Sequence, residues 1–383
     1  MIRIAAAPNA FRGSLSAFAA CEAIRAGLER AARLTGTPFE IDLLPMADGG
    51  DGTLDVLLHG LGGERITLPC TRADGEAAEA EIGIVADGTT AIIELARASG
   101  LEILPPARRD PAQTTTYGTG ELIRAALERG CRSLLIGIGG SATNDGGAGA
   151  LMALGARLLD AEGNSIALGG GGLGRLARIE ADDLRARLAG MSITILCDVD
   201  NPLIGERGAS FTFAPQKGAS PTLCAELELN LRHFAAIVQR DLGAEIAMLS
   251  GGGAAGGFGG GLAGVGAALE PGGMAILRRL GYAERIARAA LVITGEGKLD
   301  GQTAGGKAVQ AVASAAAAVG VPVIAFCGAL NMTPEALRKL GIAAAFGIAP
   351  HPAALKESMA QAAVWLESAA AQVGMLTDAL SQR

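Results

Sequence analysis

The sequence predicts an α/β protein in which both chain ends form one Rossmann-like parallel-sheet domain, with a mixed α/β domain inserted between them. Near both ends, apolar runs of strand length alternate with amphipathic helical stretches, which is typical of a parallel sheet covered by helices. The middle has short apolar runs separated by Asp-Gly signals, which favour antiparallel hairpins. The expected domains are 1–65 plus 288–383, and 66–287.

The N-terminal part reads β-α-β-α, with strands expected at 3–11 and 40–48 and helices at 16–32 and 49–59. Ser16 is the expected N-cap of the first helix. The C-terminal part alternates in the same way, and its expected strands and helices are, in order, 290–297, 308–319, 321–329, 334–340, 343–349 and 354–373. The inserted part is expected to contain strands at 64–71, 79–85, 90–96, 133–140 and 193–200, and a helix at 119–129.

Composition narrows the class of protein. The 383 residues are 50% hydrophobic, enough for a large core, and the net charge of −7 without a long basic run argues against nucleic acid and anionic membrane partners. Six cysteines without CxxC pairs predict buried thiols in a reducing compartment, and the three histidines have no zinc-ligand spacing. The uncharged run 246–269 is rich in glycine and predicts a loop, not a membrane helix. We expect a cytoplasmic protein; the sequence leaves a homo-oligomer open.

The 57 glycines, about twice the usual share of ~7%, cluster in polar loops. Several of these loops follow predicted strands, and ligands of open α/β sheets bind at that edge because backbone N–H groups and helix N-termini meet there. The sequence therefore predicts a phosphate- or carboxylate-binding cleft. The loops are 8–14, 45–53, 114–121, 137–149, 197–202, 214–220, 251–261 and 294–307.

Two of these loops imitate nucleotide-binding motifs. The stretch GQTAGGKA, 301–308, fits GxxxxGK[ST] except at Ala308, which has no hydroxyl for Mg²⁺, so a phosphate-binding loop is expected but not a true P-loop. The stretch GIGGSA, 137–142, resembles the dinucleotide fingerprint, but polar TNDGG follows it where a helix should start. An NAD(P)-dependent dehydrogenase of a small hydroxy acid therefore remains an alternative, as does a non-catalytic small-acid binding protein.

Lysine placement points to phosphate. The chain has 27 arginines and only five lysines, yet Lys217, Lys298 and Lys307 all lie in Gly-flanked polar loops. A compact ammonium suits phosphate binding at such positions, whereas chance placement in solvent is the plain alternative. Carboxylates gather in the same way after predicted strands, as Mg·nucleotide binding and proton removal from a hydroxyl require. These carboxylates are Asp48, Asp51, Asp145, Asp198, Asp200, Glu296 and Asp300.

Eight motifs, taken in order, resemble those of the bacterial two-domain (type I) glycerate kinase family. They are PNAFRGSLSA, PMADGGDGT, YGTGELI, IGIGGSATNDGGAGALMALGARLLD, CDVDNPLIGERGA, FAPQKGAS, GGAAGG and TGEGKLDGQTAGGKA. The resemblance implies ATP-dependent phosphorylation of D-glycerate, usually at the 2-hydroxyl, with the active site between a Rossmann-like domain and an inserted one. The first motif departs from the family's common PDSFKGS at Asn9, Ala10 and Arg12, so we expect the catalytic base elsewhere.

Our hypothesis assigns each loop residue a role in a reaction of Mg²⁺, ATP and D-glycerate. The expected catalytic residues are Asp48 as the base, Asp198 and Lys298. The expected metal ligands are Asp198, Glu296 and Asp300. The expected glycerate-binding residues are Asn9, Arg12, Ser14, Asp51, Ser141, Thr143, Asn144, Asp145 and Asn201. The expected ATP-binding residues are Gly49, Gly50, Lys217, Gly295, Gly297, Thr303, Gly306 and Lys307.

Overall fold

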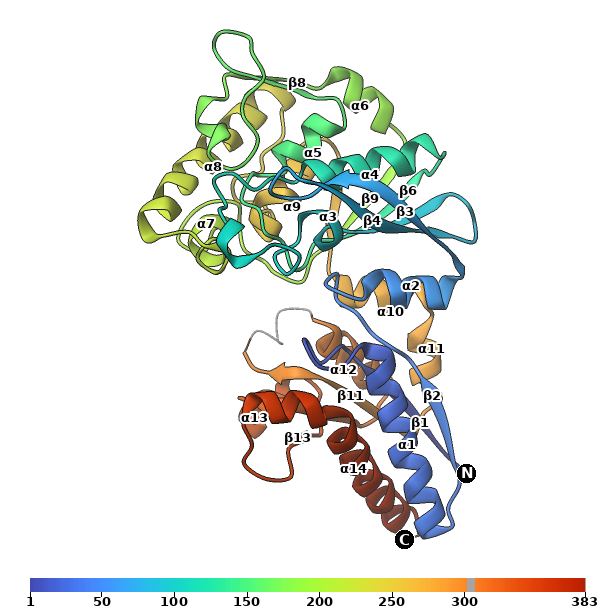
Figure 1. Cartoon of the computed structure of the whole chain (residues 1–383). Helices are drawn as coiled ribbons and strands as arrows, with labels where there is room; N and C mark the ends of the chain where they lie inside the picture. Colours follow the sequence, from blue (N-terminus) through green and yellow to red (C-terminus); the bar gives the residue numbers. More distant parts are fainter. Residues whose placement is uncertain (302–306, 383) are drawn as a thin grey trace. The chain divides into compact units, whose positions relative to one another are not determined.

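The computed structural model describes residues 1–301 and 307–382 and divides the chain into two compact units (Figure 1). Unit 1 consists of Met1–Asp48 and Gly272–Arg383, and unit 2 of Gly49–Pro271. The predicted mixed α/β class, with both chain ends in one parallel-sheet unit, is confirmed.

The unit boundaries lie closer to the N-terminus than the seams at 65 and 288. The strand at 63–71 pairs along its whole length with the next strand of unit 2, so it belongs there. Buried side chains on the far side of 272 pack instead with unit 1, among them Leu277, Tyr282 and Ile286.

Unit 1 contains a five-stranded parallel sheet in the order β13-β12-β11-β1-β2. Its strands are β1 (Ile2–Pro8), β2 (Phe39–Leu43), β11 (Leu291–Leu299), β12 (Val323–Leu330) and β13 (Ala344–Gly347). Its helices are α1 (Ala17–Thr35), α10 (Gly272–Arg279), α11 (Tyr282–Ile286), α12 (Ala308–Ala318), α13 (Pro334–Lys339) and α14 (Leu355–Ser381). The predicted cap is present: the Ser16 hydroxyl accepts from Ala19 N at 3.1 Å.

Side chains that alternate along β1 pack against helices on both faces of this sheet. Ile4 and Ala6 pack against α1 and α14, whereas Ala5 and Ala7 pack against the apolar face of α12. Figure 1 shows α1 and α14 side by side. Close packing of these two helices depends on Gly27, since a Cβ there would lie 2.3 Å from the carbonyl oxygen of Glu367.

Unit 2 is built on a six-stranded mixed sheet in the order β10-β9-β6-β5-β4-β3. The predicted hairpins are its antiparallel half, β3-β4-β5, and the rest is parallel. The strands are β3 (Gly63–Thr71), β4 (Ala77–Val85), β5 (Thr90–Glu94), β6 (Ser133–Gly137), β9 (Ser192–Leu196) and β10 (Ala268–Glu270), with a separate pair β7 (Arg157–Leu159) and β8 (Arg178–Glu180).

The α-helices of unit 2 are α2 (Thr53–Leu61), α3 (Ala96–Ser99), α4 (Tyr117–Glu128), α5 (Ala148–Ala153), α6 (Asp182–Leu188), α7 (Ala209–Phe213), α8 (Pro221–Leu242) and α9 (Phe258–Ala263). Single 3₁₀ turns lie at Pro106–Arg108, Gly172–Arg175, Pro215–Lys217 and Ala254–Gly257. The start of α2 lies later than predicted because Gly49 and Gly52 have φ of 92° and 89°, which form a turn before the helix.

The glycine-rich run 246–269 is not one long helix. It contains the turn Ala254–Gly257, the six-residue α9 and the start of β10. Across the part of the chain that the structure describes, no helix is both long enough and apolar enough to span a membrane.

Candidate active site

The connections of unit 1 reverse direction between β1 and β11. The chain runs from β1 through α1 to β2 on one side, and from β11 through α12 to β12 on the other. Helices α1 and α12 pack on opposite faces of the sheet, so the carboxyl ends of β1 and β11 flank a topological switch point. Ligands of open α/β sheets bind at such a point because the two connecting loops diverge there.

Asn9 and Asp48 meet at this edge. Asn9 directly follows β1, and its backbone N–H donates to Gly295 O at 2.8 Å, which ties it to β11. Its side-chain Nδ2 donates to Asp48 Oδ2 at 3.2 Å, and Ala10 N donates to Asn9 Oδ1 at 2.8 Å. Asp48 follows β2 and is half-buried. The predicted base therefore lies beside the β1 loop, from which the sequence alone had separated it.

The end of β11 brings a carboxylate and an ammonium to the same edge. Glu296 is 7% exposed, and Lys298 pairs with Asp300 at 2.8 Å. Gly297 lies under the β1 loop, since a Cβ there would be 3.3 Å from Arg12 N, and Arg12 itself is exposed. This glycine lets the two loops approach closely.

The expected phosphate loop is only partly described. Thr303 and Gly306 lie outside the described residues. Lys307 is the N-cap residue of α12, with φ −62° and ψ 168°, so its backbone is extended where the helix begins. The predicted helix after the loop is confirmed, and its first N–H groups are the kind of donors that bind phosphate.

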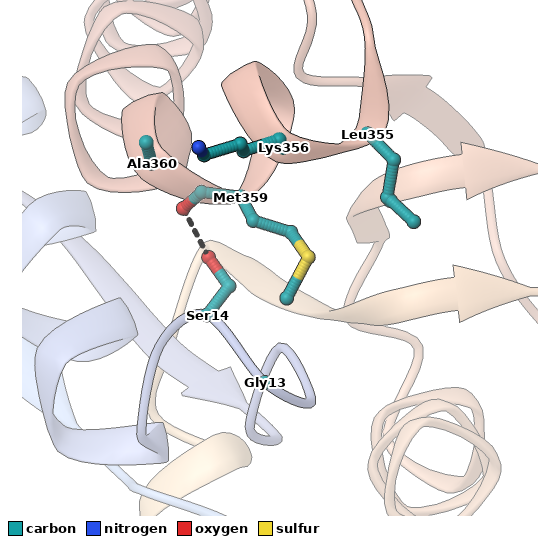
Figure 2. A pocket seen from close by; sticks show the side chains of 6 residues that line it. All are labelled: Gly13, Ser14, Leu355, Lys356, Met359 and Ala360. Atoms are coloured by element: carbon teal, nitrogen blue, oxygen red, sulfur yellow. Dashed lines mark hydrogen bonds between the residues drawn. The ribbon is translucent and has the colours of Figure 1, made fainter.

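Ser14 anchors the β1 loop to α14. Its hydroxyl donates to Met359 O at 2.7 Å, and the Met359 thioether reaches toward Gly13, as Figure 2 shows. Gly13 has a φ of 73°, and a Cβ there would meet Met359 Cε at 2.9 Å. An open pocket of about 610 Å³ is lined here by Gly13, Ser14, Leu355, Lys356, Met359 and Ala360. The Ser14 hydroxyl therefore fixes the position of the loop.

In unit 2 the loops after β5, β6 and β9 gather at the carboxyl edge of the sheet. Gly49 lies against the end of β9, because a Cβ on it would be 2.5 Å from Leu196 O. Gly139 N donates to Gly49 O at 2.9 Å, and Gly50 lies within van der Waals distance of Gly139. The predicted loops at 45–53 and 137–149 are thus in direct backbone contact, which side chains at these glycines would prevent.

Asp51 lines a second, smaller pocket of about 220 Å³ in unit 2. Glu94, buried in its wall, accepts from Leu54 N at 2.9 Å and from Arg97 Nε at 2.6 Å. The carboxylate of Glu94 therefore binds the N-terminus of α2. Sequence reasoning did not select Glu94 or Arg97; their i, i+3 spacing was the available signal.

Lys217 is the most buried lysine among the predicted site residues. Its side chain is 1% exposed, and Nζ donates to Ser141 Oγ at 2.8 Å and to Thr143 O at 2.7 Å. Burial lowers the pKa of Lys217 to about 7, and the nearby Asp145 charge opposes this shift. The structure thus brings together the predicted site residues Lys217, Ser141 and Thr143. The lysine ammonium is used to hold the loop and not left open for a phosphate.

Asp145 lies under the same loop and is fully buried. Its carboxylate accepts from Thr116 N, Thr116 Oγ1 and Gly147 N at 2.8, 2.9 and 3.1 Å, with longer bonds from Thr115 Oγ1 and Gly149 N. Burial raises the pKa of Asp145, whereas these donors favour its charged form. Sequence reasoning selected the 114–121 loop but not its threonines; three consecutive Thr residues before a helix were the signal.

Two buried side-chain oxygens of the 141–145 loop lack a hydrogen-bond partner within the described residues. Thr143 and Asn144 are both 0% exposed, and in residues 1–301 and 307–382 neither Thr143 Oγ1 nor Asn144 Oδ1 has a hydrogen-bond partner. The Asn144 amide is oriented by donation to Ser210 Oγ at 3.1 Å. Buried polar atoms are normally satisfied, so these oxygens are candidate acceptors for a ligand hydroxyl.

Asp198 and Asn201 follow β9. Asp198 is half-buried, and the Asn201 amide donates to Arg207 O at 2.6 Å, which closes its own loop. The neighbouring Asp200 is exposed and pairs with Arg207 at 2.6 Å. Of the two aspartates that follow β9, Asp198 is therefore the more buried one.

The carboxylates of unit 1 fit Mg²⁺ in the way that nucleotide enzymes use it. Across residues 1–301 and 307–382 no group of three or more His, Cys, Asp or Glu side chains is arranged to hold a metal ion. Mg²⁺ at a nucleotide site is commonly held by one or two carboxylates together with phosphates. Buried Glu296 and, four residues further along the chain, Asp300 are carboxylates of that kind.

The expected site residues fall into two groups. Unit 1 carries Asn9, Arg12, Ser14, Asp48, Gly295, Glu296, Gly297, Lys298, Asp300 and Lys307. Unit 2 carries Gly49, Gly50, Asp51, Ser141, Thr143, Asn144, Asp145, Asp198, Asn201 and Lys217. Helix α5 has six residues and begins six residues after GIGGSA, so the helix that a dinucleotide fingerprint requires directly after it is missing from this described segment.

Comparison with known proteins agrees with the family resemblance that the loop motifs indicated. The profile of the glycerate kinase family matches residues 4–378. A glycerate kinase of Halalkalibacterium halodurans is 43% identical over 98% of each chain, and the glycerate 2-kinase of Escherichia coli is 43% identical over 91% of this chain and 90% of its own. A solved structure from Salmonella typhimurium LT2, named as a glycerate kinase 2, superposes with a TM-score of 0.85 at 41% identity and covers 100% of both chains. The protein is therefore a member of the glycerate kinase family.

Proposed function

We propose that this protein transfers the γ-phosphoryl group of ATP to the 2-hydroxyl of D-glycerate, giving 2-phosphoglycerate and ADP. The relatives named as glycerate kinase and glycerate 2-kinase support the substrate. The structural observation that carries the proposal is the switch point of unit 1, where Asn9 after β1 holds Asp48, and Glu296 and Lys298 lie in the last residues of the adjacent strand β11. The buried thiols favour a reducing compartment, and we propose a cytoplasmic enzyme.

Asp48 is the proposed general base. Its carboxylate takes the proton of the 2-hydroxyl as that oxygen bonds to the γ-phosphorus, while the bond from the γ-phosphorus to the bridging oxygen breaks and ADP leaves. Little covalent chemistry falls to the protein in such a transfer, so positioning and charge neutralisation carry the rate. A half-buried carboxylate held by an amide donor suits this role.

The phosphates need cations and backbone donors. We assign charge neutralisation to Lys298 and Lys307, because one ends β11 and the other begins α12, whose N-terminus favours anions. We also assign ATP contacts to the backbone N–H groups of Gly50, Gly295, Gly297 and Gly306 and to Thr303. Gly49, whose N–H donates to Thr53 Oγ1 at 3.1 Å, supports this loop by shaping the turn before α2. Lys217 contributes through the loop that it holds, because its ammonium already donates to Ser141 and Thr143.

Glycerate is a three-carbon acid with two hydroxyls. The exposed Arg12 guanidinium suits its carboxylate, and the unsatisfied oxygens of Thr143 and Asn144 suit hydroxyl donors. The remaining proposed contacts or supports are Asn9, Ser14, Asp51, Ser141, Asp145 and Asn201.

Mg²⁺ is proposed as the metal, held by Asp198 and by Glu296 or Asp300. Bound Mg²⁺ would neutralise charge that develops on the transferred phosphoryl group. The fold positions Asp198 just after β9, Glu296 within β11 and Asp300 just after β11, and the Glu296 side chain is buried.

An ADP-release assay with D-glycerate, followed by NMR of the product, tests the proposal. We expect ADP formation that requires both substrates and a product whose phosphorus couples to the proton on C2. A product phosphorylated on C3 would show that the phosphoryl group is transferred to the 3-hydroxyl instead. Oxidation of glycerate with NAD(P), or binding of the acid without turnover, would identify instead the dehydrogenase or the binding protein and overturn the proposal.

A further inference from the structure

Asn9 occupies the first position after β1, and its backbone is tied to β11. Its N–H donates to Gly295 O at 2.8 Å, and one residue pair earlier the Thr294 hydroxyl donates to Ala7 O at 2.8 Å. The side chain is 8% exposed. From this restrained backbone the side chain reaches Asp48, which lies in the segment after β2.

The orientation of the Asn9 amide follows from its two neighbours. Ala10 N is a donor and must face Oδ1, at 2.8 Å, and this leaves the Nδ2 group to donate to the carboxylate oxygen of Asp48 at 3.2 Å. A carboxylate in place of this amide could not donate to Asp48, and an alkyl side chain could do neither. The amide is therefore matched to both partners at once.

We propose that Asn9 is a positioning residue that acts through Asp48. Its amide donates to one oxygen of the Asp48 carboxylate and so fixes the orientation of the group that accepts the proton of the glycerate 2-hydroxyl. The inference rests on the proposed function, and it replaces the expectation that Asn9 serves chiefly as a glycerate ligand. Both polar atoms of its side chain already have protein partners.

A double-mutant cycle separates positioning from substrate binding. The four proteins are wild type, Asn9→Ala, Asp48→Asn and the double variant, each assayed for kcat and KM with D-glycerate. We expect Asn9→Ala to lower kcat by about 10- to 100-fold, the range for losing a hydrogen bond to a charged group, with KM for glycerate within about threefold of wild type. In the Asp48→Asn background the same substitution should cost less than about twofold, because the group through which it acts is already changed.

Asn9→Leu serves as the second variant, since it keeps the side-chain volume and removes the donor, and the unfolding midpoint of each protein is measured alongside. If Asn9→Ala does not fold, Asn9→Leu must show the same split between kcat and KM. A rise in KM at unchanged kcat, or equal costs in both backgrounds, overturns the inference and makes Asn9 a substrate ligand. Failure of the wild type to phosphorylate glycerate would overturn the proposed function itself, and a full rate in Asp48→Asn would overturn the base together with this inference.

Discussion

The ammonium of Lys217 lies 2.7 Å from the carbonyl oxygen of Thr143, and the two groups are buried together beneath the 141–145 loop. A second bond from the same ammonium reaches Ser141 Oγ at 2.8 Å. Lys217 lies 74 residues from Thr143 in the sequence, so only the folded chain brings the pair together. This relationship makes the loop's position depend on one side chain.

Replacing Lys217 by Met should therefore loosen the loop. Two buried acceptors would lose their donor, and leaving such groups unsatisfied costs about 1–3 kcal/mol. We expect that loss in the free energy of unfolding at pH 8, measured with urea, together with faster amide hydrogen exchange in residues 141–147. Lys339→Met, at an exposed helical position, is the control and should change neither quantity. Equal exchange in both variants would contradict a positioning role.

Stability should also depend on pH through Lys217. Burial lowers its pKa to about 7 in the folded protein, against 10.5 for an ordinary lysine. Between these values the unfolded chain holds a proton that the folded protein has released, so rising pH favours the folded state. The difference in unfolding free energy between wild type and Lys217→Met should grow from pH 7 to pH 9, by at most about 1.4 kcal/mol per unit. A flat difference over urea curves at three pH values would show that the lysine keeps its ordinary pKa.

Asp48→Asn tests the base directly. The amide cannot take the hydroxyl proton, and general-base catalysis contributes about 10²- to 10⁴-fold, so kcat should fall by that amount. KM for ATP should change by less than about threefold, because no phosphate contact is assigned to Asp48. Steady-state kinetics with both substrates measures the split. A variant with near-normal kcat would remove Asp48 from the mechanism.

Lys298→Met tests the phosphate contact. The Lys298–Asp300 pair is 2.8 Å long, but the lysine side chain is 59% exposed, so its loss should hardly change stability. We expect an increase in KM for ATP or a decrease in kcat of about tenfold or more, since charge neutralisation is lost. Lys339→Met, at an exposed position of helix α13, is the matched control. Unchanged kinetics in Lys298→Met would identify a solvated lysine without a catalytic role.

Gly256→Ala tests the packing of the glycine-rich turn Ala254–Gly257 against the 141–145 loop. Gly256 has a φ of 68°, and a Cβ there would lie 2.0 Å from Thr143 O. Gly266 has a φ of 105° but open space around it, so Gly266→Ala carries only backbone strain. Gly256→Ala should lower the unfolding free energy by about 1–3 kcal/mol more than Gly266→Ala, as overpacking does. Equal effects in thermal unfolding would mean that the two loops do not pack as described.

Local chemistry made much of the fold predictable. Apolar runs that alternate with helical stretches indicated the parallel strands of unit 1. Ser16 marked the start of α1, and the Asp-Gly pairs at Asp74 and Asp87 marked the hairpin turns of unit 2. The start of α2 was missed because an Asp-Gly-rich segment can open a helix or form a turn, and the positive φ of Gly49 and Gly52 shows the turn. Helix α8, with its Ser220 cap, was not predicted either.

The sequence by itself determined the α/β class and a set of candidate site residues, because strand patterns and Gly-rich loops are short-range features that amino-acid type alone can indicate. It predicted Asp48, Lys217, Lys298 and the 141–145 loop as members of one ligand-binding site, without their mutual contacts. Only the tertiary structure decided their partners: Asn9 meets Asp48 across 39 residues, and Lys217 turns inward to Thr143. The physical reason is that a hydrogen bond depends on distance and direction in space, and residues far apart in the chain acquire these only when sheet order and helix packing bring their strand ends to one edge.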